Sequence, residues 1–254
     1  MEDCKPVATP MKTRLKLSSQ GDGESFDTTL FCQAIGCLIY LCNSRPDISY
    51  SVSLMSQFMH APMTSHWKAL KRIFRYLQGT KSHGLVFPAC DDACLVGFSD
   101  SDWGGDQDTR RSSSGHCFFY GNFAISWSSK KQPTVATYSS EAKYRAIFSA
   151  TTECLWLRRL LVDMKFGEPS ATLILSDSQS AIAIARNPVF HARTKHIEIH
   201  YHFVRDRLHD GDILFEYCPT KDNIVDLFTK ALPRVRFEAL CKALNLIPRV
   251  GFIT

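Results

Sequence analysis

The order of short strands and longer helices after residue 90 most constrains what this chain can fold into. Alternating and apolar runs predict three short strands, at 94–99, 116–120 and 124–127. Gly121-Asn122 is typical of a tight hairpin turn and joins the last two strands. These segments therefore predict an antiparallel start to a sheet.

Helices and strands then alternate. The expected elements are a helix at 139–164, a strand at 172–175, a helix from 178, a helix at 194–209, a strand at 212–217 and a closing helix at 222–232. Three antiparallel strands followed by this alternation predict an α/β domain on one mixed five-stranded sheet, flanked by helices. Trp103 and Trp127 are predicted to be core residues.

The segment before the sheet has a different pattern. Apolar residues recur at spacings of three and four over residues 31–76, and Arg45-Pro46-Asp47 and Ala61-Pro62 interrupt them. This predicts a small helical segment before the sheet. We expect three regions: a helical region at 1–89, the α/β domain at 90–235 and a C-terminal tail at 236–254.

Composition narrows the class of protein. Hydrophobic residues make up 44% and charged residues 22% of the 254, which is ordinary for a globular protein. The longest apolar stretch, near 35–42, is far shorter than the roughly 20 residues that span a bilayer, and the N-terminus lacks a secretory signal pattern. We therefore expect an intracellular protein, cytoplasmic or nuclear, without a membrane partner. Its ten scattered cysteines form no CxxC pair, which favours free buried thiols over zinc or disulfides.

Four acidic residues fall where this layout brings strand ends and helix starts together. Asp100 and Asp177 end two strands, Glu141 lies in the first turn of the long helix after Ser139 or Ser140 as its cap, and Asp226 lies in the closing helix. Carboxylates gathered at one sheet edge repel each other unless cations separate them, and Mg²⁺ prefers such oxygen ligands. The plain alternative is that each is a surface acid or a helix cap.

Several segments resemble one known family. In chain order, the motifs FSDSDWGGD, RRSSSGHCFFYGNFAISWSSKKQ, YSSEAKY, LILSDSQSAI, NPVFHARTKHIEIHYHFVRDRL and VDLFTKAL resemble the ribonuclease H region of copia-type retrotransposon Pol polyproteins. The resemblance covers essentially all of 90–235. Within 1–89, DCKPVATPMK, CNSRPDISYSVSLMSQFM and HWKALKRIFRYLQGTKSHGL resemble the end of the reverse transcriptase region and its connection to ribonuclease H.

The resemblance implies a ribonuclease H-like fold and a metal-dependent endonuclease. The family's metal-binding residues fall on Asp100, Glu141, Asp177 and Asp226, which would hold two Mg²⁺ ions, with Mn²⁺ as a substitute. The implied reaction cuts the RNA strand of an RNA–DNA hybrid and leaves a 3′-hydroxyl and a 5′-phosphate. The order Asp, Glu, Asp, Asp also argues against an integrase or a transposase, which place the glutamate last.

Three positions leave questions at this site. Asp102 is a rival to Asp100 as the first ligand, because residues two apart in a strand point to the same side. Ser178 stands where the family usually has Asn, which weakens a supporting contact. The loop before the last helix reads Cys218-Pro219-Thr220, whereas many cellular ribonucleases H carry a histidine there.

Basic residues supply candidate contacts to nucleic acid, and the net charge of +5 is concentrated at +4 in residues 1–89. The candidates are Arg110, Arg111, Lys130, Lys131, Arg193 and Lys195, and for the first helical region Lys71, Arg72 and Arg75. Plain surface charge is the alternative for each. His196 and His200 share a helical face, but their spacing lacks the glutamate of zinc proteases, which favours packing or a phosphate-facing role.

Two rival functions stay open. The chain has no paired-aspartate polymerase motif such as YxDD, and Met1 falls inside what would be reverse transcriptase, as in a truncated element. The first rival is a decayed or domesticated fragment that binds nucleic acid without catalysis, and the second is a fragment with no stable fold. Other segments of the same polyprotein are further candidate partners. If repulsion dominates at the site, Asp177→Asn should melt at the same or a higher temperature without metal.

Overall fold

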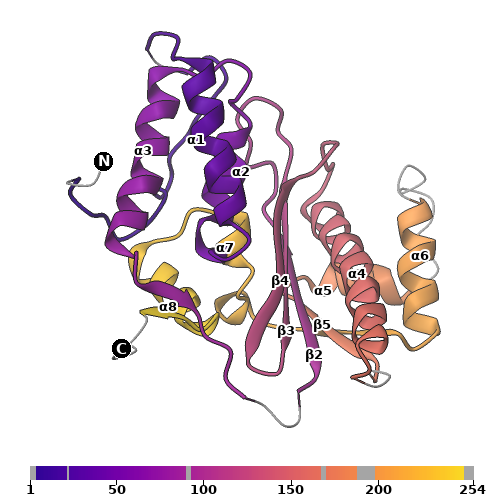
Figure 1. The fold of residues 1–254 in the computed structure, drawn as a ribbon. Coiled ribbons are helices and arrows are strands. Elements are labelled where there is room, and N and C mark those ends of the chain that lie inside the picture. The colour runs from indigo at the N-terminus through magenta and orange to yellow at the C-terminus, as the bar shows by residue number, and fades with distance from the viewer. Residues whose placement is uncertain (1–3, 22, 90–92, 167–169, 188–197, 249–254) are drawn as a thin grey trace. The chain divides into compact units, whose positions relative to one another are not determined.

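The computed structural model describes the chain except for residues 1–3, 22, 90–92, 167–169, 188–197 and 249–254. It divides into two compact units (Figure 1). The first unit comprises Met1–Phe87, Asp106–Arg110 and Lys230–Thr254, and the second comprises Pro88–Gly105 and Arg111–Thr229. Among the described helices, none has the length and apolar character needed to cross a membrane.

The first unit is mainly helical, as the apolar spacing predicts. Its elements are α1 (Thr28–Leu41), η1 (Pro46–Ile48), α2 (Ser49–Ser56), α3 (Thr64–Gly79), β1 (His83–Leu85), α8 (Arg234–Ala243) and β7 (Leu246–Pro248). Phe31, Ile35 and Leu38 place one face of α1 in the core at spacings of four and three. The break at Arg45-Pro46-Asp47 is stabilised by a buried ion pair, in which the Arg45 guanidinium lies 2.7 Å from Asp47 Oδ2.

Basic residues of α3 hold the N-terminal segment. The Arg72 guanidinium donates to Thr9 Oγ1 at 2.9 Å, and Arg75 Nε donates to the Lys5 carbonyl at 2.7 Å. The Lys71 ammonium lies 5.9 Å from the centre of the Trp67 ring. Two of the three residues expected to contact nucleic acid therefore have a structural role within the unit.

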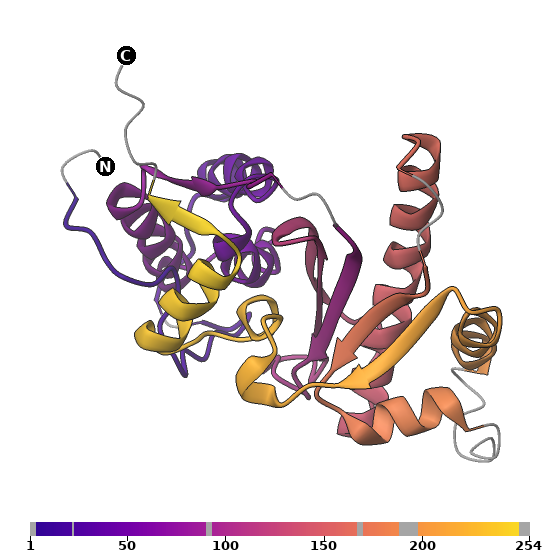
Figure 2. The same cartoon turned by 90° about the horizontal axis from the view of Figure 1, so that it is seen from below.

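The second unit is built on one five-stranded sheet in the order β4-β3-β2-β5-β6. Its strands are β2 (Leu95–Ser101), β3 (Ser113–Tyr120), β4 (Phe123–Lys131), β5 (Thr172–Ser176) and β6 (Ile213–Tyr217), and its helices are α4 (Ser139–Asp163), α5 (Gln179–Arg186), α6 (Glu198–His209) and α7 (Asp226–Thr229). β2, β3 and β4 pair antiparallel, whereas β5 is parallel to both β2 and β6. The predicted mixed five-stranded sheet is confirmed. α4, α5 and α6 lie on one side of it and α7 on the other (Figures 1 and 2).

The core of this unit lies between the sheet and α4, α5 and α6. The register places Phe118, Gly97, Ile174 and Phe215 side by side across four strands. A Cβ atom at Gly97 would lie 2.5 Å from the Phe118 ring, so this position has room only for glycine. Tyr144 and further residues of α4 complete the core. This packing positions β2 and β5, and Asp100 and Asp177 lie at the ends of these two strands.

Several expectations need correction. The closing helix predicted at 222–232 is only the four-residue α7, preceded by a 3-10 turn at Thr220–Asp222 (η4). Residues 236–254, expected to be a tail, contain most of α8 and all of β7, which pairs antiparallel with β1. Trp103 is not a core residue: it is 59% exposed, because it lies in the turn after β2. The nine cysteines in the described ranges are all free.

Candidate active site at the ends of strands β2 and β5

Asp100 and Asp177 occupy neighbouring positions at one end of the sheet. Ser99 pairs with Ser176 in the parallel register of β2 and β5, and each is followed by an aspartate: Asp100 within β2 and Asp177 directly after β5. Both side chains are buried, with 2% and 4% of their surface exposed. Two carboxylates side by side in a region of low polarity repel each other strongly.

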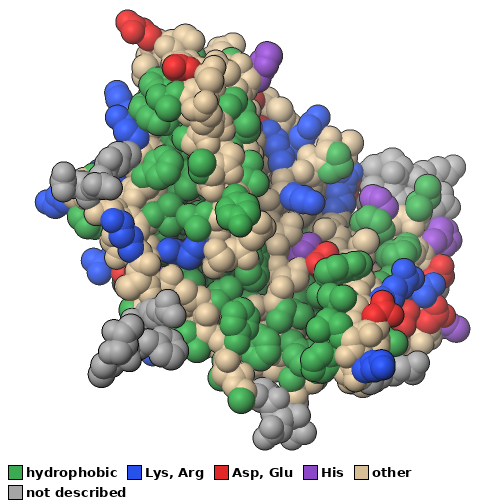
Figure 3. All heavy atoms as spheres, viewed as in Figure 1, with side chains coloured by type: hydrophobic (Ala, Val, Ile, Leu, Met, Phe, Trp, Pro, Cys, Tyr) green, Lys and Arg blue, Asp and Glu red, His purple; other side chains and the backbone are tan. Residues whose placement is uncertain are grey.

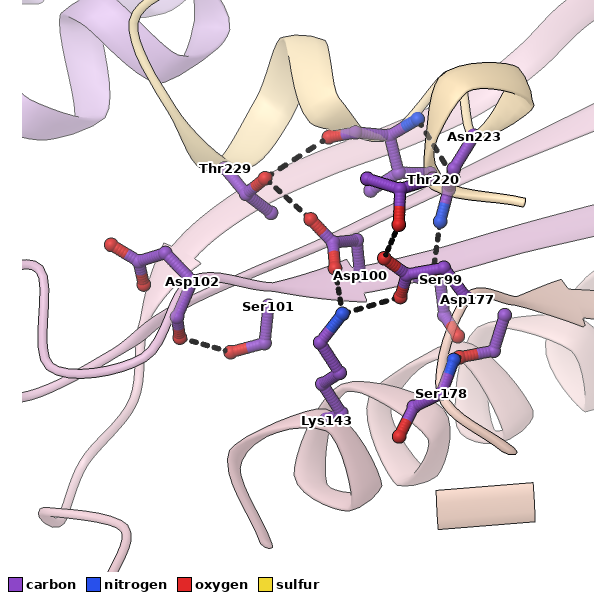
Figure 4. Close-up of polar contacts among 12 residues, drawn as sticks. Ser99, Asp100, Ser101, Asp102, Lys143, Asp177, Ser178, Thr220, Asn223 and Thr229 are labelled. Carbon is purple, nitrogen blue, oxygen red and sulfur yellow. Dashed lines mark hydrogen bonds and ion pairs between the residues drawn. The ribbon is translucent and has the colours of Figure 1, made fainter. Parts of the chain in front are cut away.

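The ammonium group of Lys143 lies between these two carboxylates (Figure 4). Its Nζ atom is 3.2 Å from Asp100 Oδ1 and donates a hydrogen bond to Asp177 Oδ1. Burial would lower the pKa of Lys143, but the two carboxylates outweigh burial and raise this pKa. Lys143 is therefore charged at neutral pH and balances much of the repulsion.

Two threonine hydroxyls hold the remaining oxygens of the pair. Thr229 Oγ1, on α7, donates to Asp100 Oδ2 at 2.8 Å, and Thr220 Oγ1, in the loop before α7, donates to Asp177 Oδ2 at 2.8 Å. Each aspartate thus turns one oxygen toward a threonine and the other toward Lys143 (Figure 4). The two carboxylate planes are fixed from both sides.

Glu141 has a different set of partners. It lies in the first turn of α4 and is 6% exposed. Its Oε2 atom accepts a hydrogen bond from the Thr137 backbone amide at 2.9 Å, and its Oε1 atom lies 2.6 Å from the Arg145 guanidinium. The expected cap at Ser139 or Ser140 is wrong: the helix begins at Ser139 after Tyr138, whose side chain makes no capping bond.

Asp226 begins α7 and is 5% exposed. It lies one helical turn before Thr229. The short helix α7 therefore carries both Asp226, a proposed ligand, and Thr229, whose hydroxyl donates a hydrogen bond to Asp100. The buried amide of Asn223 fixes this segment to the sheet. It donates to the Ser99 carbonyl at 3.1 Å and accepts from the Val225 amide at 3.1 Å.

Gln132 ties the start of α4 to the sheet in a similar way. Its buried side-chain amide donates to the Ala142 carbonyl at 2.9 Å and to Ser114 Oγ at 2.8 Å. Ala142 directly follows Glu141, so Gln132 fixes the position of that turn. Sequence reasoning missed Lys143, Gln132, Thr220, Asn223 and Thr229. Only Thr220 had a signal, because it lies in the loop where a histidine was expected.

The four predicted carboxylates are only partly brought together. Among the residues that the structure describes, no three or more His, Cys, Asp or Glu side chains form a group that could hold a metal ion. Asp100 and Asp177 do share one cation, the Lys143 ammonium. Two buried carboxylates whose oxygens converge on one positive charge fit a divalent ion, with the ammonium as its stand-in. The full set of four stays a prediction.

The geometry separates Asp102 from Asp100. Asp102 lies one residue beyond β2, and its Oδ1 atom accepts a hydrogen bond from the Ser113 amide. In Figure 4 its carboxylate points away from Lys143. Asp102 therefore stabilises the turn after β2. Ser178 also has a local role, since its hydroxyl caps α5 by accepting from the Ala181 amide at 3.2 Å.

The basic candidates fall in different places. Lys130 and Lys131 end β4 and pair in register with Ser114 and Ser113, at the same end of the sheet as Asp100. Arg110 is exposed and has a positive φ of 56°, and Arg111 is half-buried. Arg193 and Lys195 lie outside the described residues, as does His196.

Histidine side chains gather over α6 on the right of Figure 3. His200 is a residue of α6 and stacks on Phe148, with ring centroids 3.9 Å apart. Burial lowers the pKa of His200, with Arg145 acting in the same direction. His200 is therefore neutral at pH 7 and has a packing role, one of the two roles considered for it.

Comparison with known proteins places this arrangement in context. No protein-family model matches the chain. It is 39% identical over 247 residues to the retrovirus-related Pol polyprotein from transposon RE2 of Arabidopsis thaliana, covering 97% of this chain and 17% of that protein. It is 41% identical over 238 residues to the corresponding polyprotein from transposon RE1, covering 94% and 16%. The chain thus spans about a sixth of the length of these relatives.

Solved structures give a weaker likeness. A foamy viral protease–reverse transcriptase dRH in complex with double-stranded DNA aligns with a TM-score of 0.50 and 12% identity, covering 78% of this chain and 33% of that one. The N-terminal ribonuclease H domain of a Mycobacterium tuberculosis protein aligns with a TM-score of 0.42 and 12% identity, covering 60% and 99%.

Proposed function

Because the chain belongs to the retrovirus-related Pol polyproteins of copia-type transposons, we propose that it is a ribonuclease H that hydrolyses the RNA strand of RNA–DNA hybrids. In this proposal Asp100, Glu141, Asp177 and Asp226 hold two Mg²⁺ ions, for which Mn²⁺ can substitute. Metal ions in such sites activate water and stabilise the leaving oxygen of a phosphodiester. The products would be a 3′-hydroxyl and a 5′-phosphate.

One observation carries the proposal: two buried aspartates end adjacent parallel strands and turn their oxygens toward a single cation. A structural ion pair needs only one carboxylate for each ammonium. Two buried carboxylates in contact with one monovalent cation leave a net negative site, and such a site is suited to a divalent ion.

The chain's own residues have assigned tasks in this proposal. Thr229 and Thr220 orient the two aspartates through the oxygens that face away from Lys143. Lys130 and Lys131, at the same end of the sheet, would contact the phosphate backbone of the hybrid, and Arg110, Arg111, Arg193 and Lys195 are further candidates for that contact. Selectivity for the hybrid would come from 2′-hydroxyl contacts to its RNA strand.

A cleavage assay on the full chain tests the proposal. A hybrid labelled on its RNA strand is incubated with Mg²⁺, and the ends of the products are identified. We expect Asp100→Asn, Glu141→Gln, Asp177→Asn and Asp226→Asn to remove cleavage. Asp163→Asn, on the exposed end of α4, is the matched control and should leave cleavage unchanged. Asp102→Asn discriminates between the two candidates for the first ligand.

Loss of cleavage in Asp102→Asn, measured on folded protein, with retention in Asp100→Asn would move the first ligand to Asp102. A wild-type chain that binds Mg²⁺ and hybrid but never cuts would overturn the enzyme proposal.

A second candidate function is nucleic-acid binding without catalysis. The observation that favours it is that basic residues of α4 are already paired with three of the four carboxylates, Lys143 with Asp100 and Asp177, and Arg145 with Glu141. This candidate predicts hybrid binding that is insensitive to Mg²⁺. Other segments of the polyprotein would then be the natural partners, and co-purification with them would test this.

A further inference from the structure

Lys143 has a position that the proposed reaction does not require. Its ammonium is in contact with Oδ1 of both Asp100 and Asp177, and its side chain is 21% exposed. The other oxygen of each aspartate is bonded to a threonine hydroxyl. Lys143 therefore contacts, on each aspartate, the oxygen that is not bonded to a threonine.

The helix geometry explains how the ammonium reaches this place. Lys143 lies four residues after Ser139, the first residue of α4, so its side chain emerges within the first turns of the helix. Residues two apart on a helix point in different directions, so Lys143 and Glu141 do not share a face. Glu141 is paired with Arg145, one turn further along. α4 thus supplies one cation to the Asp100–Asp177 pair and a second cation to Glu141.

Lysine is suited to a reversible contact of this kind. Its four-carbon chain has many rotamers, and its compact ammonium is strongly hydrated in water. An arginine at the same position would present a rigid planar fork that binds carboxylates in pairs. Because part of the Lys143 side chain is exposed, rotation about its side-chain bonds can take the ammonium into solvent without opening the core.

We propose that Lys143 is a built-in counter-cation of the Asp100–Asp177 pair, and that a divalent ion binds this pair only by displacing its ammonium. Lys143 thus stabilises the metal-free protein and sets the concentration of divalent ion at which the site fills. This inference rests on the proposed function, since it requires that the pair bind a metal ion.

Calorimetric titration of the full chain with MgCl₂ tests the competition. Lys143→Gln should bind Mg²⁺ at least about tenfold more tightly than the wild type, because displacing a charge-assisted hydrogen bond of the ammonium costs about that factor or more. Arg159→Gln is the matched control. It removes one positive charge from an exposed position of α4, about 24 Å along the helix from Lys143, and should bind like the wild type.

A second measurement uses only the wild-type chain, in case Lys143→Gln does not fold. Amine acylation, followed by mass spectrometry of peptides, reports how accessible each lysine is. We expect labelling of Lys143 to rise when Mg²⁺ is added, whereas labelling of the exposed Lys165 stays constant. Unchanged or reduced labelling of Lys143, at concentrations where calorimetry shows binding, would overturn the displacement.

The two ideas fail in different ways. Equal or weaker Mg²⁺ affinity in folded Lys143→Gln than in the wild type would overturn the competition and leave the proposed ribonuclease H standing. Absence of Mg²⁺ binding in both proteins would overturn both proposals, and Lys143 would then be a permanent partner of the two aspartates.

Discussion

Asn223 connects the residues that directly precede two of the proposed ligands, and its removal is the most informative perturbation of the fold around the site. Its side-chain amide donates to the carbonyl of Ser99, next to Asp100, and accepts from the amide of Val225, next to Asp226. The side chain is completely buried. Asn223→Ala removes both bonds, and no solvent is available to replace them.

The expected cost follows from the two partners left behind. A buried donor or acceptor that loses its partner costs about 1–3 kcal/mol, so two of them predict a loss of about 2–6 kcal/mol. The Ser99 carbonyl lies in the central strand β2, and the Val225 amide lies one residue before α7. The loss should therefore be concentrated in these two segments, and Mg²⁺ affinity should fall with it because Asp226 is no longer fixed relative to Asp100.

Hydrogen exchange measured by mass spectrometry suits this test, because a chain of two units need not unfold in a single step. Peptides covering 95–101 and 220–229 should exchange about 30-fold faster or more in Asn223→Ala, which corresponds to about 2 kcal/mol. Asn122→Ala, in the exposed hairpin turn between β3 and β4, is the control and should leave both peptides unchanged. Exchange in Asn223→Ala that matches the wild type within about twofold would refute the reasoning.

Three further predictions follow from other contacts. Asp177→Asn should lower the melting temperature of the metal-free protein by about 2–6 °C, because it weakens the contacts with Lys143 and Thr220. Repulsion between the carboxylates alone predicts the opposite, an equal or higher melting temperature. An unchanged or higher value would therefore show that repulsion outweighs these contacts. Burial lowers the pKa of His116 to about 4; Lys130 acts in the same direction and Glu153 opposes it. The unfolded chain therefore binds the proton more readily than the folded one. The free energy of unfolding should fall by up to about 3 kcal/mol as the pH drops from about 6.5 to about 4. His116→Phe should flatten that dependence in urea unfolding curves, and an unchanged slope would assign it to other groups. The double variant Arg72→Gln/Arg75→Gln should speed hydrogen exchange of residues 5–9, and exchange equal to that of the wild type would contradict the structural role of the two arginines. Lys71→Gln alone tests whether this helix contacts the hybrid, through the salt dependence of hybrid binding.

The parts of the fold that follow from local patterns were predictable. α4 begins at Ser139, as expected, and ends at Asp163, one residue before the expected end. β5 begins at Thr172 and extends one residue beyond the expected Leu175. Helical and strand periodicity report directly on which residues face a core, and both elements face it over most of their length.

The chain after β6 could not be predicted in the same way. Ile224, Val225, Leu227 and Phe228 are buried, and their spacing favoured one long helix. The buried Asn223 instead bonds to the Val225 amide and keeps the backbone out of a regular helix there. Pro233 then disfavours helical geometry at the residue before it and precedes the first residue of α8. The β1–β7 pairing joins residues about 160 positions apart, which no local pattern reports.

The candidate site, too, could be predicted from the sequence only in part. Strand endings and motif resemblance identified Asp100 and Asp177, and the structure brings them together at the ends of adjacent parallel strands. Sequence reasoning treated the site as carboxylates that repel one another until metal ions arrive. That reasoning omitted the positive charges, because Lys143 and Arg145 appear in the sequence only as polar positions of a helix with one buried face. Their importance depends on the sheet register, which sets Asp100 beside Asp177, and on the packing of α4, which brings an ammonium to both. The charge balance of such a site is therefore a property of tertiary structure, and the sign of any substitution in it has to be derived from the contacts rather than from the ligands alone.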